Sequence, residues 1–188
     1  MKIGVLALQG AFREHGEAFD ALGADVVFVR VAEHLAGIDA IAIPGGESTV
    51  IDKLLDSSGL REPVAALVRD GAPTFATCAG LIVLAVEISD GRPDQRPLGL
   101  LDVTVRRNGY GRQVDSFEAP ITVTGMAGAP FPGVFIRAPI VERVGAAVEV
   151  LAMHEDRPVL CRQDSIWAAS FHPELSGDLR VHERFLAG

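Results

Sequence analysis

The chain has 188 residues, of which 48% are hydrophobic, so it fits one compact domain that buries about 70% of the surface its unfolded form exposes. Seventeen basic residues against twenty-five acidic ones give a net charge of −8, and no segment is rich in Lys and Arg, which disfavours nucleic acid and anionic membranes as partners. The uncharged, apolar stretch at residues 71–86 is shorter than the roughly 20 residues needed to span a bilayer.

The first half of the chain alternates strand-like and helix-like segments, which indicates a mostly parallel sheet covered by helices. Residues 3–8 are nearly all apolar, as expected of a strand buried on both faces. Phe12, Phe19 and Leu22 recur at helical spacing and predict the first helix. Further strands are predicted at residues 25–31, 40–43 and 74–77, and further helices at residues 50–55, 60–69 and 79–86.

The second half begins after a charged, turn-rich connector at residues 90–97. Short β-rich segments separated by turns then predict antiparallel strands at residues 101–105, 121–124, 134–136, 148–153, 158–161 and 166–170, before a short helix at residues 179–186. The predicted fold is therefore a single α/β domain over residues 1–188, with a mostly parallel central sheet, flanking helices and added antiparallel strands.

Cys78 lies where a predicted strand meets a turn of small residues and then a predicted helix. A free Cys in an apolar run is more often an ordinary core residue. However, Ala76, Ala79 and Gly80 keep bulk away from the turn, as a nucleophile elbow requires, and the amide of the next residue then faces any oxyanion that forms. Cys161 has no such turn after it and is predicted to be a strand residue.

The two cysteines also bear on the compartment. They are far apart in sequence, and the N-terminal segment lacks the small-residue cleavage site of a secretory signal. We therefore expect two free thiols and a cytoplasmic protein.

His172 is the candidate general base. Glu174 is two residues on, so on an extended segment both side chains leave the same face, and the carboxylate can orient the imidazole that serves Cys78. The alternative is a solvated loop after a strand. The other histidines, His15, His34, His154 and His182, are not predicted to be the base; His34 and His182 have no carboxylate two residues on, and His15 stands in a predicted helix and not at a strand end. No His/Cys cluster has zinc-ligand spacing, so no metal site is expected.

Residues 44–49, Pro-Gly-Gly-Glu-Ser-Thr, follow a predicted strand and precede a predicted helix. The glycines can bring backbone amides close to a bound carbonyl, while Glu47 can receive an ammonium group and Ser48 a carboxylate. The alternative is a tight turn with Ser48 as the helix N-cap. The segment lacks the Lys and the spacing of a phosphate-binding loop, which disfavours nucleotide binding.

Two arginine-bearing segments complete the set of polar candidates. Residues 106–113 form the densest polar stretch, and Arg137 stands inside a predicted apolar strand. An Arg in such surroundings needs an anionic partner, either a ligand or an internal carboxylate.

Taken together, these segments resemble the class I (triad) glutamine amidotransferases, and within them the glutaminase-subunit family of pyridoxal 5'-phosphate synthase. The Cys elbow and the His-x-Glu pair are typical of the wider class. The narrower resemblance is carried by residues 4–12, 44–49, 77–82, 107–108, 111–118, 135–139 and 171–175. One departure is Ala76, where the family usually has Gly.

The resemblance implies that Cys78 is the nucleophile, His172 the acid and base, and Glu174 the group that orients it. It implies glutamine contacts for Gly46, Glu47, Ser48, Arg107, Ile136 and Arg137. In the mechanism we expect, the amide of Ala79 and an N–H of the turn, that of Gly46, hold the oxyanion.

The resemblance also implies a partner. Ammonia would pass to a separate synthase subunit that makes pyridoxal 5'-phosphate from ribose 5-phosphate and glyceraldehyde 3-phosphate, and that docks near the site and activates it. Pyridoxal phosphate is then a product, and no cofactor is expected. Two alternatives remain: a glutaminase serving another synthase, such as one making imidazole glycerol phosphate, and a DJ-1-like redox sensor, which does not place His-x-Glu near the C-terminus.

Overall fold

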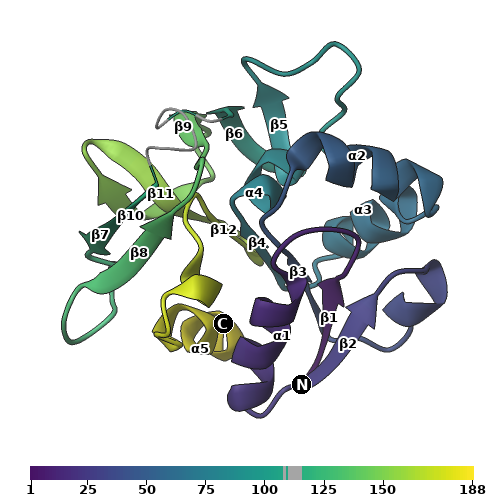
Figure 1. The fold of residues 1–188 in the computed structure, drawn as a ribbon, viewed down its shortest axis with the longest axis horizontal. Coiled ribbons are helices and arrows are strands. Elements are labelled where there is room, and N and C mark those ends of the chain that lie inside the picture. The colour runs from purple at the N-terminus through teal and green to yellow at the C-terminus, as the bar shows by residue number, and fades with distance from the viewer. Residues whose placement is uncertain (108, 110–115) are drawn as a thin grey trace.

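A seven-stranded sheet forms the centre of the computed structural model, which describes residues 1–107, 109 and 116–188 (Figure 1). The strand order is β10-β11-β12-β4-β3-β1-β2. The strands are β1 (Lys2–Leu6), β2 (Asp25–Val29), β3 (Ala40–Ile43), β4 (Thr74–Thr77), β10 (Glu149–His154), β11 (Arg157–Gln163) and β12 (Ile166–Ala169). The five strands from β12 to β2 are parallel, and β11 and β10 add antiparallel pairs at one edge, which confirms the predicted fold class.

Helices cover both faces of this sheet because the central strands are apolar on both sides. Within β3, Ala40 and Ala42 pack in one core cluster while Ile41 and Ile43 pack in the other, as the two-residue period of a strand requires. The first cluster also receives α1 and α5, and the second receives α2, α3 and α4. The helices are α1 (Phe12–Ala21), α2 (Ser48–Ser57), α3 (Arg61–Arg69), α4 (Ala79–Leu84) and α5 (Arg180–Ala187), with 3-10 turns η1 (Ala32–Leu35) and η3 (Pro173–Leu175).

Two smaller sheets stand beside the central one (Figure 1). The first is built from β5 (Ala85–Ile88), β6 (Leu101–Arg106) and β9 (Ile140–Val144), with β5 and β6 parallel and β6 and β9 antiparallel. The second is the antiparallel pair of β7 (Phe117–Ile121) and β8 (Phe131–Phe135). None of the helices in the described part of the chain is long and apolar enough to cross a membrane.

The structure corrects three expectations in this region. The helix predicted at residues 79–86 ends at Leu84, because the chain turns there into β5. The strand predicted at residues 121–124 lies earlier, in β7, whose Pro120 pairs opposite Pro132 in a two-stranded ribbon that tolerates missing backbone donors. Strand β9 was not predicted, since two adjacent charged residues interrupt its apolar pattern.

Candidate active site

Cys78 occupies a strained turn between β4 and α4. Its φ of 48° and ψ of −102° form a backbone conformation that residues other than glycine rarely adopt. The Cys78 N–H donates to the Ala169 carbonyl at 2.8 Å, which ties the turn to the end of β12. Gly80 is required behind it, because a methyl group there would lie 2.0 Å from the Ile43 carbonyl oxygen. Ala76, where glycine was expected, is fully buried in β4 without a positive φ, so its methyl group is accommodated.

The second cysteine has different surroundings. Cys161 lies in β11 as predicted, and both thiols are free. Burial raises the pKa of the Cys161 thiol to about 12, so it stays protonated and unreactive at neutral pH.

His172 and Glu174 form a hydrogen-bonded pair. The imidazole Nδ1 of His172 lies 2.7 Å from Glu174 Oε1. The segment is not extended as predicted, because His172 directly precedes the 3-10 turn η3, which contains Glu174. The His172 N–H donates to the Val134 carbonyl at 2.8 Å, which fixes the backbone against β8. The pairing therefore arises from one tight turn and not from the period of a strand.

Charge is concentrated on this pair. Burial alone would lower the pKa of His172, but hydrogen bonds and charge interactions with Cys78 and Glu174 outweigh it and raise the pKa to about 10. Burial would likewise raise the pKa of Glu174, whose side chain has no exposed surface, but His15 and His172 hold it below its usual value. At neutral pH the site thus contains a buried carboxylate and a cationic imidazole beside the sulfur.

A cavity of about 170 Å³ opens over Cys78. It is lined by Gln9, Gly46, Glu47, Ser48, Cys78, Ile82, Arg107, Ile136, Arg137 and His172. All six residues predicted to contact glutamine are in this lining, together with the predicted nucleophile and base. The Glu174 side chain and Ala79 are buried and are not part of this lining. The volume is below that of sites for drug-sized ligands and suits a small polar molecule.

Glu47 and Arg137 face each other across the cavity. Glu47 Oε2 lies 3.8 Å from an Arg137 guanidinium nitrogen. Glu47 is the N-cap of α2, accepting from the Thr49 N–H at 3.5 Å, so Ser48 begins the helix and is not its cap. Arg137 lies beyond the end of β8 with φ 47°, which corrects its predicted place inside a strand. Its anionic partner in this structure is internal.

Gln95 joins two of the predicted substrate contacts and was not predicted itself. Its amide nitrogen donates to Ser48 Oγ at 3.1 Å, and its amide oxygen accepts from the Arg107 guanidinium at 3.2 Å. It lies in the turn-rich connector, where neither pattern nor composition marked a functional residue.

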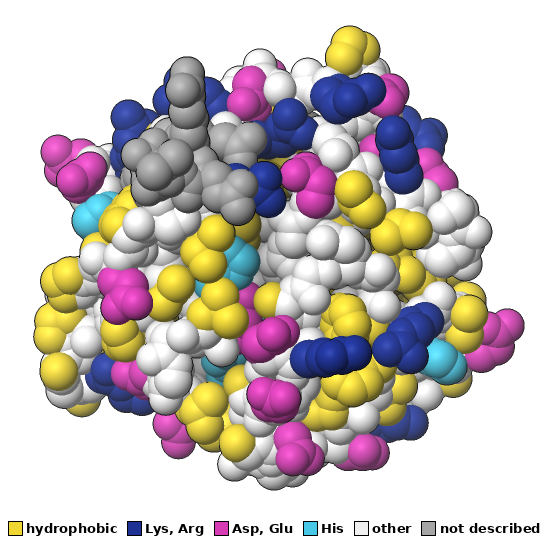
Figure 2. All heavy atoms as spheres, in the orientation of Figure 1, with side chains coloured by type: hydrophobic (Ala, Val, Ile, Leu, Met, Phe, Trp, Pro, Cys, Tyr) yellow, Lys and Arg dark blue, Asp and Glu magenta, His cyan; other side chains and the backbone are white. Residues whose placement is uncertain are grey.

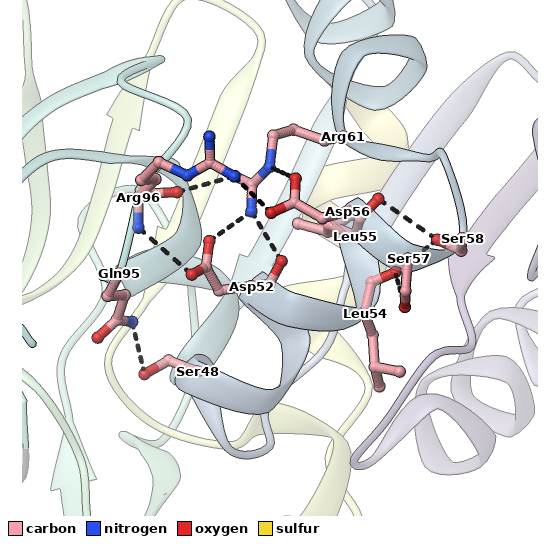
Figure 3. A network of polar contacts seen from close by, with 10 residues as sticks. All are labelled: Ser48, Asp52, Leu54, Leu55, Asp56, Ser57, Ser58, Arg61, Gln95 and Arg96. Carbon is pink, nitrogen blue, oxygen red and sulfur yellow. Dashed lines mark hydrogen bonds and ion pairs between the residues drawn. The ribbon is translucent and has the colours of Figure 1, made fainter.

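A charged network holds this connector against α2 (Figure 3). The Arg96 N–H donates to Asp52 Oδ2 at 3.3 Å, and the Arg96 guanidinium pairs with Asp56. Arg61, at the start of α3, donates to both of these carboxylates and to the Arg96 carbonyl. The network therefore fixes the backbone directly beside Gln95.

Gln9 is a further contact that sequence reasoning did not assign. Its Oε1 accepts from the Glu47 N–H at 2.7 Å, and its position after the end of β1, beside the turn after β3, is the signal that could have found it. Of the predicted family segments, Asn108 and residues 111–115 lie outside the described residues. Across the ranges that are described, no group of three or more His, Cys, Asp or Glu side chains is arranged to hold a metal ion.

Comparisons with known proteins agree with this geometry. The model of the SNO glutamine amidotransferase family matches residues 5–188. A protein of Dehalococcoides mccartyi named "Pyridoxal 5'-phosphate synthase subunit PdxT" is 54% identical over 187 residues, covering 99% of this chain and 96% of the relative. One of the same name from Frankia casuarinae is 54% identical over 98% of this chain and 93% of its own length.

Among solved structures, one described as a glutamine amidotransferase superposes with a TM-score of 0.92 at 52% identity, covering 98% of this chain and 97% of that one. Both the matched length and the level of identity are far above what a shared fold alone would give. The chain therefore belongs to the SNO glutamine amidotransferase family.

Proposed function

We propose that residues 1–188 act as one glutaminase domain that hydrolyses L-glutamine to L-glutamate and ammonia through Cys78, His172 and Glu174. The observation that carries the proposal is the cavity in which the thiol and the imidazole meet all six predicted substrate contacts. Family membership supports the reaction class, and the geometry supports the assignment of roles.

The reaction begins when the Cys78 thiolate attacks the side-chain carboxamide carbon, with His172 holding the proton. The developing oxyanion is held by the amide of Ala79 and by an N–H of the Gly45-Gly46 turn. The Gly45 N–H already donates to Thr77 Oγ1 at 3.0 Å, so Gly46 is the donor that the turn can offer.

His172 then protonates the departing ammonia, and a thioester to Cys78 remains. Water attacks this thioester after giving a proton to the same imidazole, which releases glutamate and restores the thiol. Glu174 keeps its charge throughout, because it orients and stabilises the imidazolium without taking the proton.

Recognition of glutamine follows from the charges around the cavity. Glu47 would receive the α-ammonium group, and Ser48, with the guanidinium groups of Arg107 and Arg137, would bind the α-carboxylate; all four line the cavity. Binding would then replace the long Glu47–Arg137 contact with two closer ion pairs to the ligand.

The fate of the ammonia is proposed from the relatives, which are named as subunits of pyridoxal 5'-phosphate synthase. A synthase subunit would dock near the cavity, activate the glutaminase and use the ammonia to make pyridoxal 5'-phosphate from ribose 5-phosphate and glyceraldehyde 3-phosphate. That compound is a product of the complex and not a cofactor of this chain. A reducing cytoplasm, which keeps the thiol free, is the compartment we propose.

Nucleic acid and membranes are not proposed as partners. On the face shown in Figure 2, basic and acidic side chains are interspersed, so this face offers no extended basic surface. The net charge of −8 points the same way.

The test is glutamate release by the wild type, Cys78→Ala and the matched control Cys161→Ala, each with and without the synthase subunit. We expect no activity from Cys78→Ala and near-normal activity from Cys161→Ala, whose thiol is buried in β11. A glutamine analogue should label Cys78 covalently. Activity surviving in Cys78→Ala would overturn the nucleophile, and stimulation only by a different acceptor subunit would overturn the partner.

A further inference from the structure

We propose that His15 and His182 are positioning residues for glutamine hydrolysis, forming a buried chain of imidazoles that holds the second carboxylate oxygen of Glu174. This inference rests on the proposed function, since it concerns the same reaction. It extends the active site from the cavity through the core to α5.

His15 is distant in sequence from Glu174 and His182, and none of the three side chains has solvent access. His15 Nε2, from α1, lies 3.2 Å from Glu174 Oε2. His15 Nδ1 lies 3.1 Å from His182 Nε2, from α5. Since Glu174 Oε1 is engaged by His172, the carboxylate lies between two imidazoles, one on the cavity side and one on the core side.

The second oxygen of Glu174 needs this neighbour. Oε2 is fully buried, and no well-aligned donor reaches it from the described residues. The closer partner of His15 Nε2 is Thr77 Oγ1 at 2.9 Å, so its N–H is shared between the hydroxyl and the carboxylate. Hydrogen bonds in unliganded active sites are often poorly aligned and tighten when substrate binds. His15 is therefore the donor available to offset the burial of this oxygen.

The protons along the chain can be assigned from the partners. A carboxylate only accepts, so the approach of Nε2 to Glu174 Oε2 places the proton of His15 on Nε2, and Thr77 Oγ1, which accepts from the Gly45 N–H, has a second lone pair to share it. Its Nδ1 is then an acceptor and takes the Nε2 proton of His182. This leaves His182 Nδ1 as an acceptor, and that atom has no partner among the described residues. An unpaired buried acceptor costs less than an unpaired donor.

Neutral imidazoles are what this role requires. Burial lowers the pKa of His15 despite the attraction of Glu174 and Glu14, and repulsion from His172 adds to the effect. Burial, with repulsion from His15, lowers the pKa of His182 to about 3. A charged His15 would neutralise Glu174, whereas a neutral one directs a dipole at it and leaves the full carboxylate charge to stabilise the imidazolium of His172.

Aromatic side chains enclose the two imidazoles of His15 and His182 and exclude water from them. The His182 ring has centroid distances of 5.1 Å to Phe19 and 5.2 Å to Phe75, and the His15 ring lies 5.7 Å from Phe75. This apolar enclosure opposes protonation, and it strengthens each hydrogen bond within it.

The experiment compares His15→Gln, whose amide nitrogen can take the place of Nε2, with His15→Asn, whose amide reaches only the Nδ1 position. Both variants replace a buried imidazole by an amide of similar chemistry. The comparison therefore does not require His15→Leu, a bulkier and apolar change, to fold. Each variant is assayed with the activating synthase subunit for kcat, KM and the pH profile of kcat/KM. Phe19→Leu is the control for loss of packing in the same cluster.

We expect His15→Asn to lower kcat roughly 10- to 100-fold with little change in KM, the loss typical of a hydrogen bond to a charged group. The acidic limb of the kcat/KM profile of His15→Asn should move to higher pH, because a Glu174 that lacks its donor takes up a proton more readily. The groups that face this carboxyl are His15, His172 and, through His15, His182. His15→Gln should stay within about threefold of the wild type, as expected when one neutral donor replaces another.

Nitrogen-15 spectra of labelled histidine give an independent readout, in which His15 and His182 should be neutral with protonated Nε2 at pH 7. Equal kcat and equal pH profiles in His15→Gln and His15→Asn would overturn the inference, as would a limb shift in Phe19→Leu or a protonated Nδ1 on His15. A wild-type protein that releases no glutamate would instead overturn the proposed function, while the spectra would still report the proton assignment.

Discussion

Gly45 packs directly against the imidazole of His172: a methyl group on its Cα would lie 2.4 Å from Cε1 and 2.9 Å from Nδ1. The backbone of Gly45 cannot move away easily, because its N–H donates to Thr77 and its carbonyl accepts from the Ala11 N–H at 3.0 Å. The absence of a side chain at this position thus sets where the His172 imidazole lies relative to Cys78.

Gly45→Ala should therefore displace the imidazole and lower kcat by about 100-fold, the typical cost of a displacement near 1 Å at a reacting group. The measurement is glutamate release at saturating glutamine with the synthase subunit present. Gly59→Ala is the control, since nothing lies within 4 Å of a methyl group there and its cost arises only from a positive φ. Normal kcat in a folded Gly45→Ala protein would show that the imidazole position is not limiting.

A second prediction concerns the alkaline limb of activity. Because the pKa of His172 is raised to about 10, the proton that we propose it gives to ammonia is retained until the pH approaches that value. kcat should fall as pH rises through about 10. In Glu174→Gln the imidazolium loses its charged partner, so the limb should move to lower pH and kcat should fall at least tenfold. His34→Gln, which alters an exposed histidine, should leave the limb in place.

The same shift affects stability with a defined sign. The folded protein holds a proton on His172 that the unfolded chain releases above its ordinary pKa of 6.5. This contribution is complete below pH 6.5 and is lost as pH rises toward about 10. Urea unfolding of the wild type should show it between those values, and Glu174→Gln should show a smaller decline.

Gln95 gives a prediction about binding. Gln95→Ala removes one hydrogen bond to Ser48 and one to Arg107, each of which contributes on the order of 1 kcal/mol. We expect KM for glutamine to rise roughly 5- to 20-fold with kcat within about threefold, because neither bond touches the reacting atoms. Arg92→Ala is the matched control from the same loop: it breaks an exposed pair with Asp94 that contributes little. An unchanged KM in Gln95→Ala would show that Ser48 and Arg107 hold their positions unaided.

The central strands could be predicted from sequence because burial on both faces leaves mostly apolar residues in them. β3 begins and ends where its apolar run does, and β4, with a Thr at each end, encloses Phe75 and Ala76. β7 and β9 could not, since a proline or adjacent charges in a half-exposed strand resemble a loop. The hydrophobic pattern reflects burial, and these two strands carry exposed residues: Glu118 and Pro120 in β7, and Glu142 and Arg143 in β9.

The candidate site divides in the same way. Cys78 and the His172–Glu174 pair could be identified because each depends on a few consecutive residues. His15 and His182 were not predicted to belong to the site because neither stands at the end of a predicted strand. Their role depends on a contact across 167 residues, which only the folded chain creates.

The buried histidines predict how the protein responds to acid. Burial first, then repulsion from His15, lowers the pKa of His182 to about 3, while the unfolded chain binds this proton near pH 6.5. The folded protein therefore binds fewer protons than the unfolded chain between these values, and its stability should fall as pH falls, by at most about 1.4 kcal/mol per pH unit for this group.

His182→Gln keeps a donor for His15 but does not titrate. Its free energy of unfolding, measured with urea from pH 7 to pH 4, should vary less steeply than that of the wild type, even if it is lower at pH 7. His34→Gln, which alters an exposed histidine, should keep the wild-type slope. If His182→Gln instead lost stability with acid as steeply as the wild type, the acid sensitivity would have to arise from other groups, with His15 the first to test.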